Sequence, residues 1–67
     1  MFDKSGFMEY LHENFSFNVT TLWLIESVVD YGIKNFGQSK DGTSYFIYDI
    51  IRGIESIDIE EIEQFER

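Results

Sequence analysis

The clearest hydrophobic pattern in the chain spans residues 19–36. Asn18 precedes it and Gly37 follows it, and these residue types commonly begin and end helices. The pattern therefore predicts a helix from Val19 to Phe36. At about 100° per residue, its apolar side chains cover more than half of the helix circumference: Leu22, Leu24, Ile25, Val28, Val29, Ile33 and Phe36. Such a broad apolar arc predicts a central helix contacted by the other elements.

A shorter helical pattern precedes it, over residues 3–14. Phe7, Leu11 and Phe15 recur at intervals of four residues, and Met8 lies on the same stripe. Either Asp3 or Ser5 is a suitable N-cap residue. We expect an amphipathic helix here.

The segment 41–52 is rich in β-branched and aromatic residues, so a strand is an alternative to a helix. Strict alternation of apolar and polar positions fails twice, which favours the helix. Ser39 or Asp41 would cap its start and Gly53 would follow its end. Five apolar residues then share one helix face and are expected to be buried: Phe46, Ile47, Ile50, Ile51 and Ile54.

The last segment, residues 58–66, predicts a short acidic helix. Asp58 followed by Glu61 matches a capping box. Ile59, Ile62 and Phe65 form the expected buried stripe. The remaining side chains of this helix are expected to form a negatively charged, solvated face.

These segments predict an all-α fold, a compact bundle of about four short helices. The chain has 67 residues, which is room for a single acidic helical domain over residues 1–67. Seven Phe, four Tyr and one Trp supply the apolar side chains that so small a core needs.

The net charge of the chain limits the classes of partner that it is expected to bind. Thirteen acidic and five basic residues give a net charge of −8, which opposes direct binding to nucleic acid and to anionic membranes. It favours a protein partner with a basic surface, of which nucleic-acid-binding proteins are the most abundant class. There is no cysteine, no membrane-spanning run and no signal peptide, which fits a cytoplasmic protein.

Catalytic and cofactor signals are absent from the sequence. His12 is the only histidine, and no His or carboxylate spacing is typical of a metal site. No nucleophile-elbow motif or phosphate-binding loop is present. We therefore expect no enzymatic activity, no metal and no cofactor, and treat a small enzyme using His12 as the least favoured hypothesis.

Aromatic residues outside the apolar stripes are the candidate binding anchors. Trp23 lies on the helical wheel among Glu26, Ser27, Asp30 and Lys34, so it is either covered by another helix or exposed to a partner. Tyr45 and Tyr48 are expected on the side of their helix away from the apolar stripe. Exposed aromatic residues often dominate the energy of an interface.

The acidic last helix has two interpretations. It is a solubilising face, or its carboxylates imitate DNA phosphates and dock into a basic groove. Under the second interpretation, the predicted partner-binding residues are Trp23, Tyr45, Tyr48, Asp58, Glu60, Glu61 and Glu63.

The order of short segments over about residues 20–65 resembles small acidic accessory proteins of Gram-positive phages and conjugative elements. The segments are Leu24-Ile25-Glu26, Tyr31-Gly32, Ser39-Lys40-Asp41, Tyr45-Phe46-Ile47, Asp49-Ile50-Ile51 and Ile59-Glu60-Glu61-Ile62-Glu63-Gln64-Phe65. That family has a proline before its last helix, whereas this chain has Gly53-Ile54-Glu55. The family is uncharacterised, so the resemblance implies no functional residue and only favours a host-directed inhibitor or regulator.

Two functional hypotheses follow. The first is a non-enzymatic module that docks a basic protein surface, with a DNA-mimic inhibitor or regulator of a mobile element as one version. Its binding should weaken steeply with salt. The alternative is a homodimeric structural or assembly protein, in which a second copy covers the broad apolar arc of residues 19–36.

Overall fold

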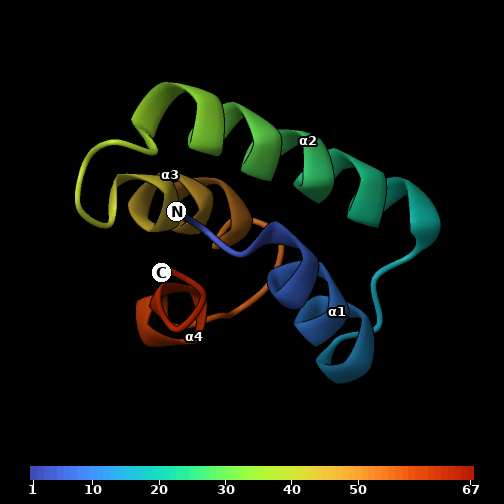
Figure 1. Cartoon of the computed structure of the whole chain (residues 1–67). Helices are drawn as coiled ribbons and strands as arrows, with labels where there is room; N and C mark the ends of the chain where they lie inside the picture. Colours follow the sequence, from blue (N-terminus) through green and yellow to red (C-terminus); the bar gives the residue numbers. More distant parts are fainter.

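Four helices and no strand make up the chain, which confirms the all-α prediction. The computed structural model describes all 67 residues. Its helices are α1 (Lys4–Asn14), α2 (Val19–Phe36), α3 (Gly42–Ile51) and α4 (Ile59–Glu63). Figure 1 shows α2 lying across α1 and α3, with α4 packed below α3 and away from α2. No helix has the length and apolarity needed to cross a membrane.

The starts of α1 and α2 follow the predicted capping. The Asp3 carboxylate accepts the Gly6 backbone N–H at 3.0 Å, and the Asn18 side chain accepts the Thr21 N–H at 2.8 Å. Each bond satisfies one of the backbone donors that a helix leaves unpaired at its N-terminus. The predicted bounds of α2 are confirmed, and Gly37 follows its last residue.

The start of α3 differs from the prediction. Asp41 precedes the helix, but its side chain makes no capping hydrogen bond and its backbone has the left-handed φ of 59°. A carboxylate from the far end of the chain takes that role. One oxygen of Glu66 accepts the backbone N–H of Ser44 at 3.2 Å and the Ser44 hydroxyl at 3.0 Å. Glu66 is therefore a long-range cap for α3.

Asp41→Gly is expected to stabilise the protein, by up to about 1 kcal/mol, because a left-handed backbone strains every residue with a Cβ atom. Gln38→Gly is the matched control, since Asp41 is the only non-glycine residue with positive φ. The control should destabilise through the greater entropy of its unfolded chain. Urea denaturation measures the free energy of unfolding of both variants. If both lose stability by a similar amount, the left-handed backbone of Asp41 is not the source of strain.

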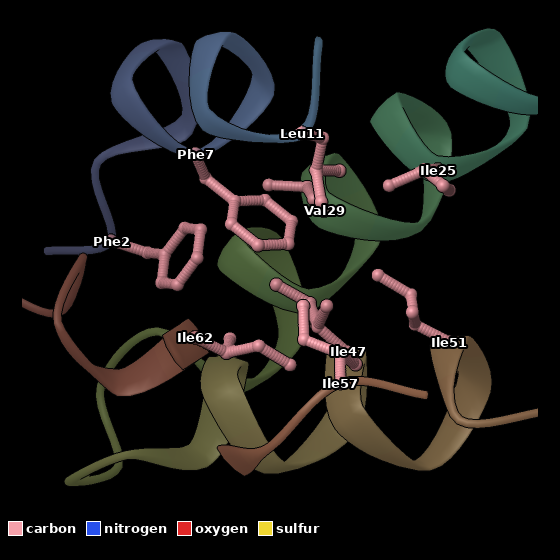
Figure 2. Close-up of a cluster of buried hydrophobic side chains, with 9 residues drawn as sticks. All are labelled: Phe2, Phe7, Leu11, Ile25, Val29, Ile47, Ile51, Ile57 and Ile62. Atoms are coloured by element: carbon pink, nitrogen blue, oxygen red, sulfur yellow. The ribbon is translucent and has the colours of Figure 1, made fainter. Parts of the chain in front are cut away.

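Nine apolar residues form a single core, drawn in Figure 2. They come from all four helices, from the N-terminal segment and from the loop before α4, and their side chains point into one interior. The core residues are Phe2, Phe7, Leu11, Ile25, Val29, Ile47, Ile51, Ile57 and Ile62.

The buried face of α3 is rotated from the predicted one. Ile47 and Ile51 are buried as expected, but Ile50 and Ile54 are 41% and 45% exposed. In their place α3 buries Thr43 and Ser44. The cause is Gly32 on α2: a Cβ there would lie only 3.2 Å from the Thr43 methyl group, so its absence admits the first turn of α3. The Thr43 hydroxyl donates to the Gly32 carbonyl at 3.2 Å, so this buried hydroxyl has a hydrogen-bond partner.

The two chain termini meet beside α4. Phe2 and Glu66 form an isolated antiparallel bridge, and the Asp3 N–H donates to the Phe65 carbonyl at 2.7 Å. The Phe2 ring packs against Phe7, with centroids 5.4 Å apart. Helix α4 ends at Glu63, so Phe65 lies beyond it and joins this aromatic cluster from the C-terminal segment.

Candidate protein-binding surface

The side of α2 that faces away from the core carries large exposed apolar side chains. Trp23 is 67% exposed, Val19 60%, and Leu24 and Tyr31 56% each. The sequence left open whether another helix covers Trp23, and none does. Burying such side chains against a partner is favourable by about 25 cal/mol for each Å² of apolar area.

The charged neighbours of Trp23 are partly neutralised by α1. The Lys4 ammonium lies 3.0 Å from the Asp30 carboxylate and 3.5 Å from that of Glu26. The hydrogen bond to Asp30 and the two carboxylate charges raise the pKa of Lys4, against an opposing desolvation effect. One lysine shared by two carboxylates leaves a local excess of negative charge beside Trp23.

The two tyrosines of α3 lie in different environments. Tyr45 is 54% exposed, whereas Tyr48 is half-buried and packs against the core. The Arg52 guanidinium lies over the Tyr48 ring, 5.7 Å from its centroid. Tyr45 is thus free to contact a partner, while much of Tyr48 already packs inside the protein.

The carboxylates of the last helix that were predicted to bind a partner differ in their exposure and in their hydrogen bonds. Asp58 and Glu60 are exposed, and Glu63 is half-buried. Glu61 is occupied within the fold: it accepts the Tyr10 hydroxyl from α1 and the Asp58 backbone N–H at 2.9 Å, the glutamate arm of the expected capping box. The structure therefore gives Glu61 a role in joining α4 to α1, which the sequence analysis did not predict.

The Tyr10–Glu61 hydrogen bond should make stability depend on pH. The Tyr10 hydroxyl, followed by the Asp58 N–H, lowers the pKa of Glu61 from its ordinary 4.5. A lowered carboxyl pKa contributes stability above 4.5, and this contribution is lost as the pH falls through the lowered value. The same bond, with desolvation, raises the pKa of Tyr10, so a second contribution is lost only at alkaline pH.

Tyr10→Phe is expected to return the pKa of Glu61 part of the way to its ordinary value, because only the Asp58 N–H then remains. NMR titration of the Glu61 carboxyl carbon measures the shift. Tyr45→Phe is the control, since that hydroxyl makes no hydrogen bond to a carboxylate and should change nothing. An unchanged pKa of Glu61 in Tyr10→Phe would contradict the assigned cause.

The predicted partner-binding residues do not form one surface. Trp23 lies on α2, whereas Asp58, Glu60 and Glu63 belong to α4 and the residue before it. Figure 1 shows α4 on the opposite side of α3 from α2. A partner contacting both groups would have to extend around the molecule. The outer face of α2 and the acidic end at α4 are therefore separate candidate surfaces.

A second exposed apolar feature includes part of the α2 arc that the homodimer hypothesis assigns to a second copy. We define the α2–α3 stripe as Leu24, Val28, Tyr31 and Phe36 of α2 with Phe46 and Ile50 of α3. Its aromatic rings pack together: the Phe46 centroid lies 5.4 Å from that of Tyr31 and 5.1 Å from that of Phe36. The sequence signal was the apolar arc of α2, which is wider than its neighbouring helices cover.

The structure has two hollows. One, of about 330 Å³, lies between the end of α3 and the start of α4, and the other, of about 390 Å³, lies beside residues 37–41 and the termini. His12 is exposed on α1 and lines neither. No group of three or more His, Cys, Asp and Glu side chains is arranged to hold a metal ion.

In comparisons with known proteins, the chain matches no protein-family model, no curated protein and no solved structure.

Proposed function

We propose that this protein is a non-enzymatic binding module that docks a basic surface of another protein, with Trp23 as its main anchor. One observation carries the proposal: Trp23 is 67% exposed on the longest helix of a protein whose net charge is −8. A large aromatic side chain that leaves water on binding is a typical interface hot spot. A strong charge of one sign speeds association with a partner of the opposite sign.

The acidic surface supports the choice of a basic partner. Several carboxylates on different helices form no hydrogen bond or ion pair: Glu9, Glu13, Asp49, Glu60 and Glu63. They leave most of the negative charge unneutralised by the protein itself. A DNA mimic is the special case in which the partner's basic surface is a nucleic-acid groove. The resemblance to accessory proteins of mobile elements favours an inhibitor or regulator, which we place in the cytoplasm.

The test is capture of partners from a bacterial lysate with the tagged protein, followed by identification and purification of the retained protein. Its affinity is then measured at low and high salt for the wild type and for Trp23→Ala. We expect affinity to fall steeply with salt. We also expect Trp23→Ala to weaken binding about 30-fold, corresponding to a loss of about 2 kcal/mol.

Tyr45→Ala is the comparison variant, because it removes the other exposed aromatic candidate, which lies on α3. It should change affinity less than Trp23→Ala. Binding that is insensitive to salt, or equal in Trp23→Ala and the wild type, would contradict the proposal.

A homodimer is the second candidate, favoured by the exposed apolar residues Leu24, Tyr31 and Ile50. Burial of these side chains by a second copy would give a structural or assembly protein without a basic partner. Sedimentation over a concentration series separates the candidates. A monomer at every concentration removes the dimer.

A further inference from the structure

The α2–α3 stripe lies across a hairpin of two helices. Residues 37–41 join α2 to α3, and α3 runs back beside α2 (Figure 1). The Phe46 ring of α3 packs against Tyr31 and Phe36 of α2, at centroid distances of 5.4 and 5.1 Å. Leu24 precedes Tyr31 by two helical turns, so both lie on one line of α2. The stripe is therefore continuous across the two helices.

No other helix covers the stripe. Helix α1 contacts α2 along a different edge, where Lys4 lies against Glu26 and Asp30. Figure 1 shows α4 on the opposite side of α3 from α2. Leu24 and Tyr31 are therefore 56% exposed. Two helix hairpins packed face to face form a four-helix bundle, which would bury this stripe in both copies.

Two unpaired charges of opposite sign flank the stripe. On α2, Lys34 lies about 60° around the helix from Tyr31, on the edge away from α3. On α3, Asp49 lies about 60° from Phe46, on the opposite side from Thr43, whose hydroxyl bonds to α2. Neither Lys34 nor Asp49 forms an ion pair or a hydrogen bond. The stripe thus has one positive and one negative edge.

These flanking charges remove the main electrostatic objection to a second copy. The whole chain carries −8, which opposes self-association in general. Beside the stripe, however, one lysine faces one aspartate, so the local charge is balanced. Charges further away are screened over about 8–10 Å at physiological salt.

A two-fold axis parallel to the helices would pair the two edges. This rotation places α2 of one copy over α3 of the other and keeps neighbouring helices antiparallel, as in an up-and-down bundle. Phe46 lies level with the last two turns of α2, and Asp49 is one turn further along α3. Lys34 is then offset from Asp49 of the other copy by about 5 Å along the axis, which a lysine side chain can span. An axis across the helices would instead bring each edge over itself, with like charges opposed.

We propose that two copies of this protein pair through the α2–α3 stripe, with Lys34 of each copy beside Asp49 of the other. This gives the homodimer a specific face and symmetry. It also goes beyond the proposed function, because Trp23 lies outside the stripe, on the side of Glu26 and Asp30. The dimer therefore presents two Trp23 anchors and is compatible with docking to a basic partner.

Reversal of the flanking charges tests the arrangement, with sedimentation over a concentration series measuring the dimer dissociation constant of the intact protein. Lys34→Glu should weaken the dimer at least about tenfold, because symmetry creates two pairs of like charges. Adding Asp49→Lys to Lys34→Glu should restore the dissociation constant to within about threefold of the wild type. Lys40→Glu is the matched control, since it makes the same charge change at an exposed lysine outside the stripe, and should change the constant less than about twofold.

Leu24→Gln tests the apolar part of the interface, and Val19→Gln is its matched control. Both replace an exposed aliphatic side chain of α2 with a polar one, at 56% and 60% exposure, so neither should unfold the protein. We expect Leu24→Gln to weaken the dimer about tenfold, and Val19→Gln to change it less than about twofold.

Three results would overturn the inference: a wild-type monomer at every concentration, a dimer that Leu24→Gln leaves unchanged, or a loss in Lys34→Glu that Asp49→Lys does not restore. A monomer whose basic partner binds with dependence on Trp23 would remove this inference and leave the proposed function standing. A dimer that behaves as expected in every variant but captures no basic partner would support this inference and remove the docking function.

Discussion

Phe7→Ala is expected to leave the chain unfolded or nearly so at room temperature. Phe7 is fully buried, and its ring meets those of Phe2 and Phe65 edge-on, at centroid distances of 5.4 and 5.5 Å. Deleting such a side chain costs about 3–5 kcal/mol. The core of so short a chain rarely supplies more than about 3–5 kcal/mol of net stability. The loss therefore equals most or all of the free energy of unfolding.

Phe36→Ala is the matched control for that experiment, because it removes the same atoms from a ring that is 38% exposed at the end of α2. The control should stay folded with a smaller loss. Circular dichroism and a two-dimensional amide NMR spectrum report the state of each variant. A folded Phe7→Ala with a loss no greater than that of Phe36→Ala would contradict the assigned core.

Glu66→Ala is expected to destabilise the protein by about 1–3 kcal/mol, the usual cost of a buried polar group without a partner. Ser44 is fully buried, and both its N–H and its hydroxyl donate to one Glu66 oxygen. Asp41 offers no replacement, since its side chain makes no cap for α3. Removal of the carboxylate thus leaves two buried donors unpaired at the start of that helix.

Glu63→Ala controls for the general effect of removing a glutamate near the C-terminus, because Glu63 is also half-buried but its side chain makes no hydrogen bond. It should alter the free energy of unfolding by much less. Glu66→Gln should restore part of the loss, since its amide oxygen still accepts a hydrogen bond. Urea denaturation measures all three variants. Equal losses for Glu66→Ala and Glu63→Ala would rule out the long-range cap.

Local signals predicted the helices well where the structure depends on neighbours in sequence. Asn18 and Gly37 bracket α2 and Asp3 caps α1, as expected from residue type alone. The rotation of α3 was missed because it depends on Gly32, a residue of another helix that leaves space for Thr43. The pairing of Ser44 with Glu66 joins residues 22 positions apart, so no helical periodicity reveals it.

The binding surface was less predictable than the helices. The wheel placed Trp23 outside the apolar arc but could not show whether another helix covers it, since that depends on how the helices pack. The same limit applies to Glu61: its position in the sequence predicts a solvated face, whereas its side chain accepts the Tyr10 hydroxyl. The separation of Trp23 from the α4 carboxylates likewise follows only from the arrangement of the helices (Figure 1).

Fluorescence of Trp23 tests the central claim most directly, because it is the only tryptophan and marks the proposed anchor. In the free protein we predict emission typical of a water-exposed indole and ready quenching by acrylamide at every protein concentration. Addition of the captured basic partner should shift the emission to shorter wavelength and protect the ring from quenching, and high salt should reverse both changes. Partner binding that leaves the emission and quenching of Trp23 unchanged would contradict the account.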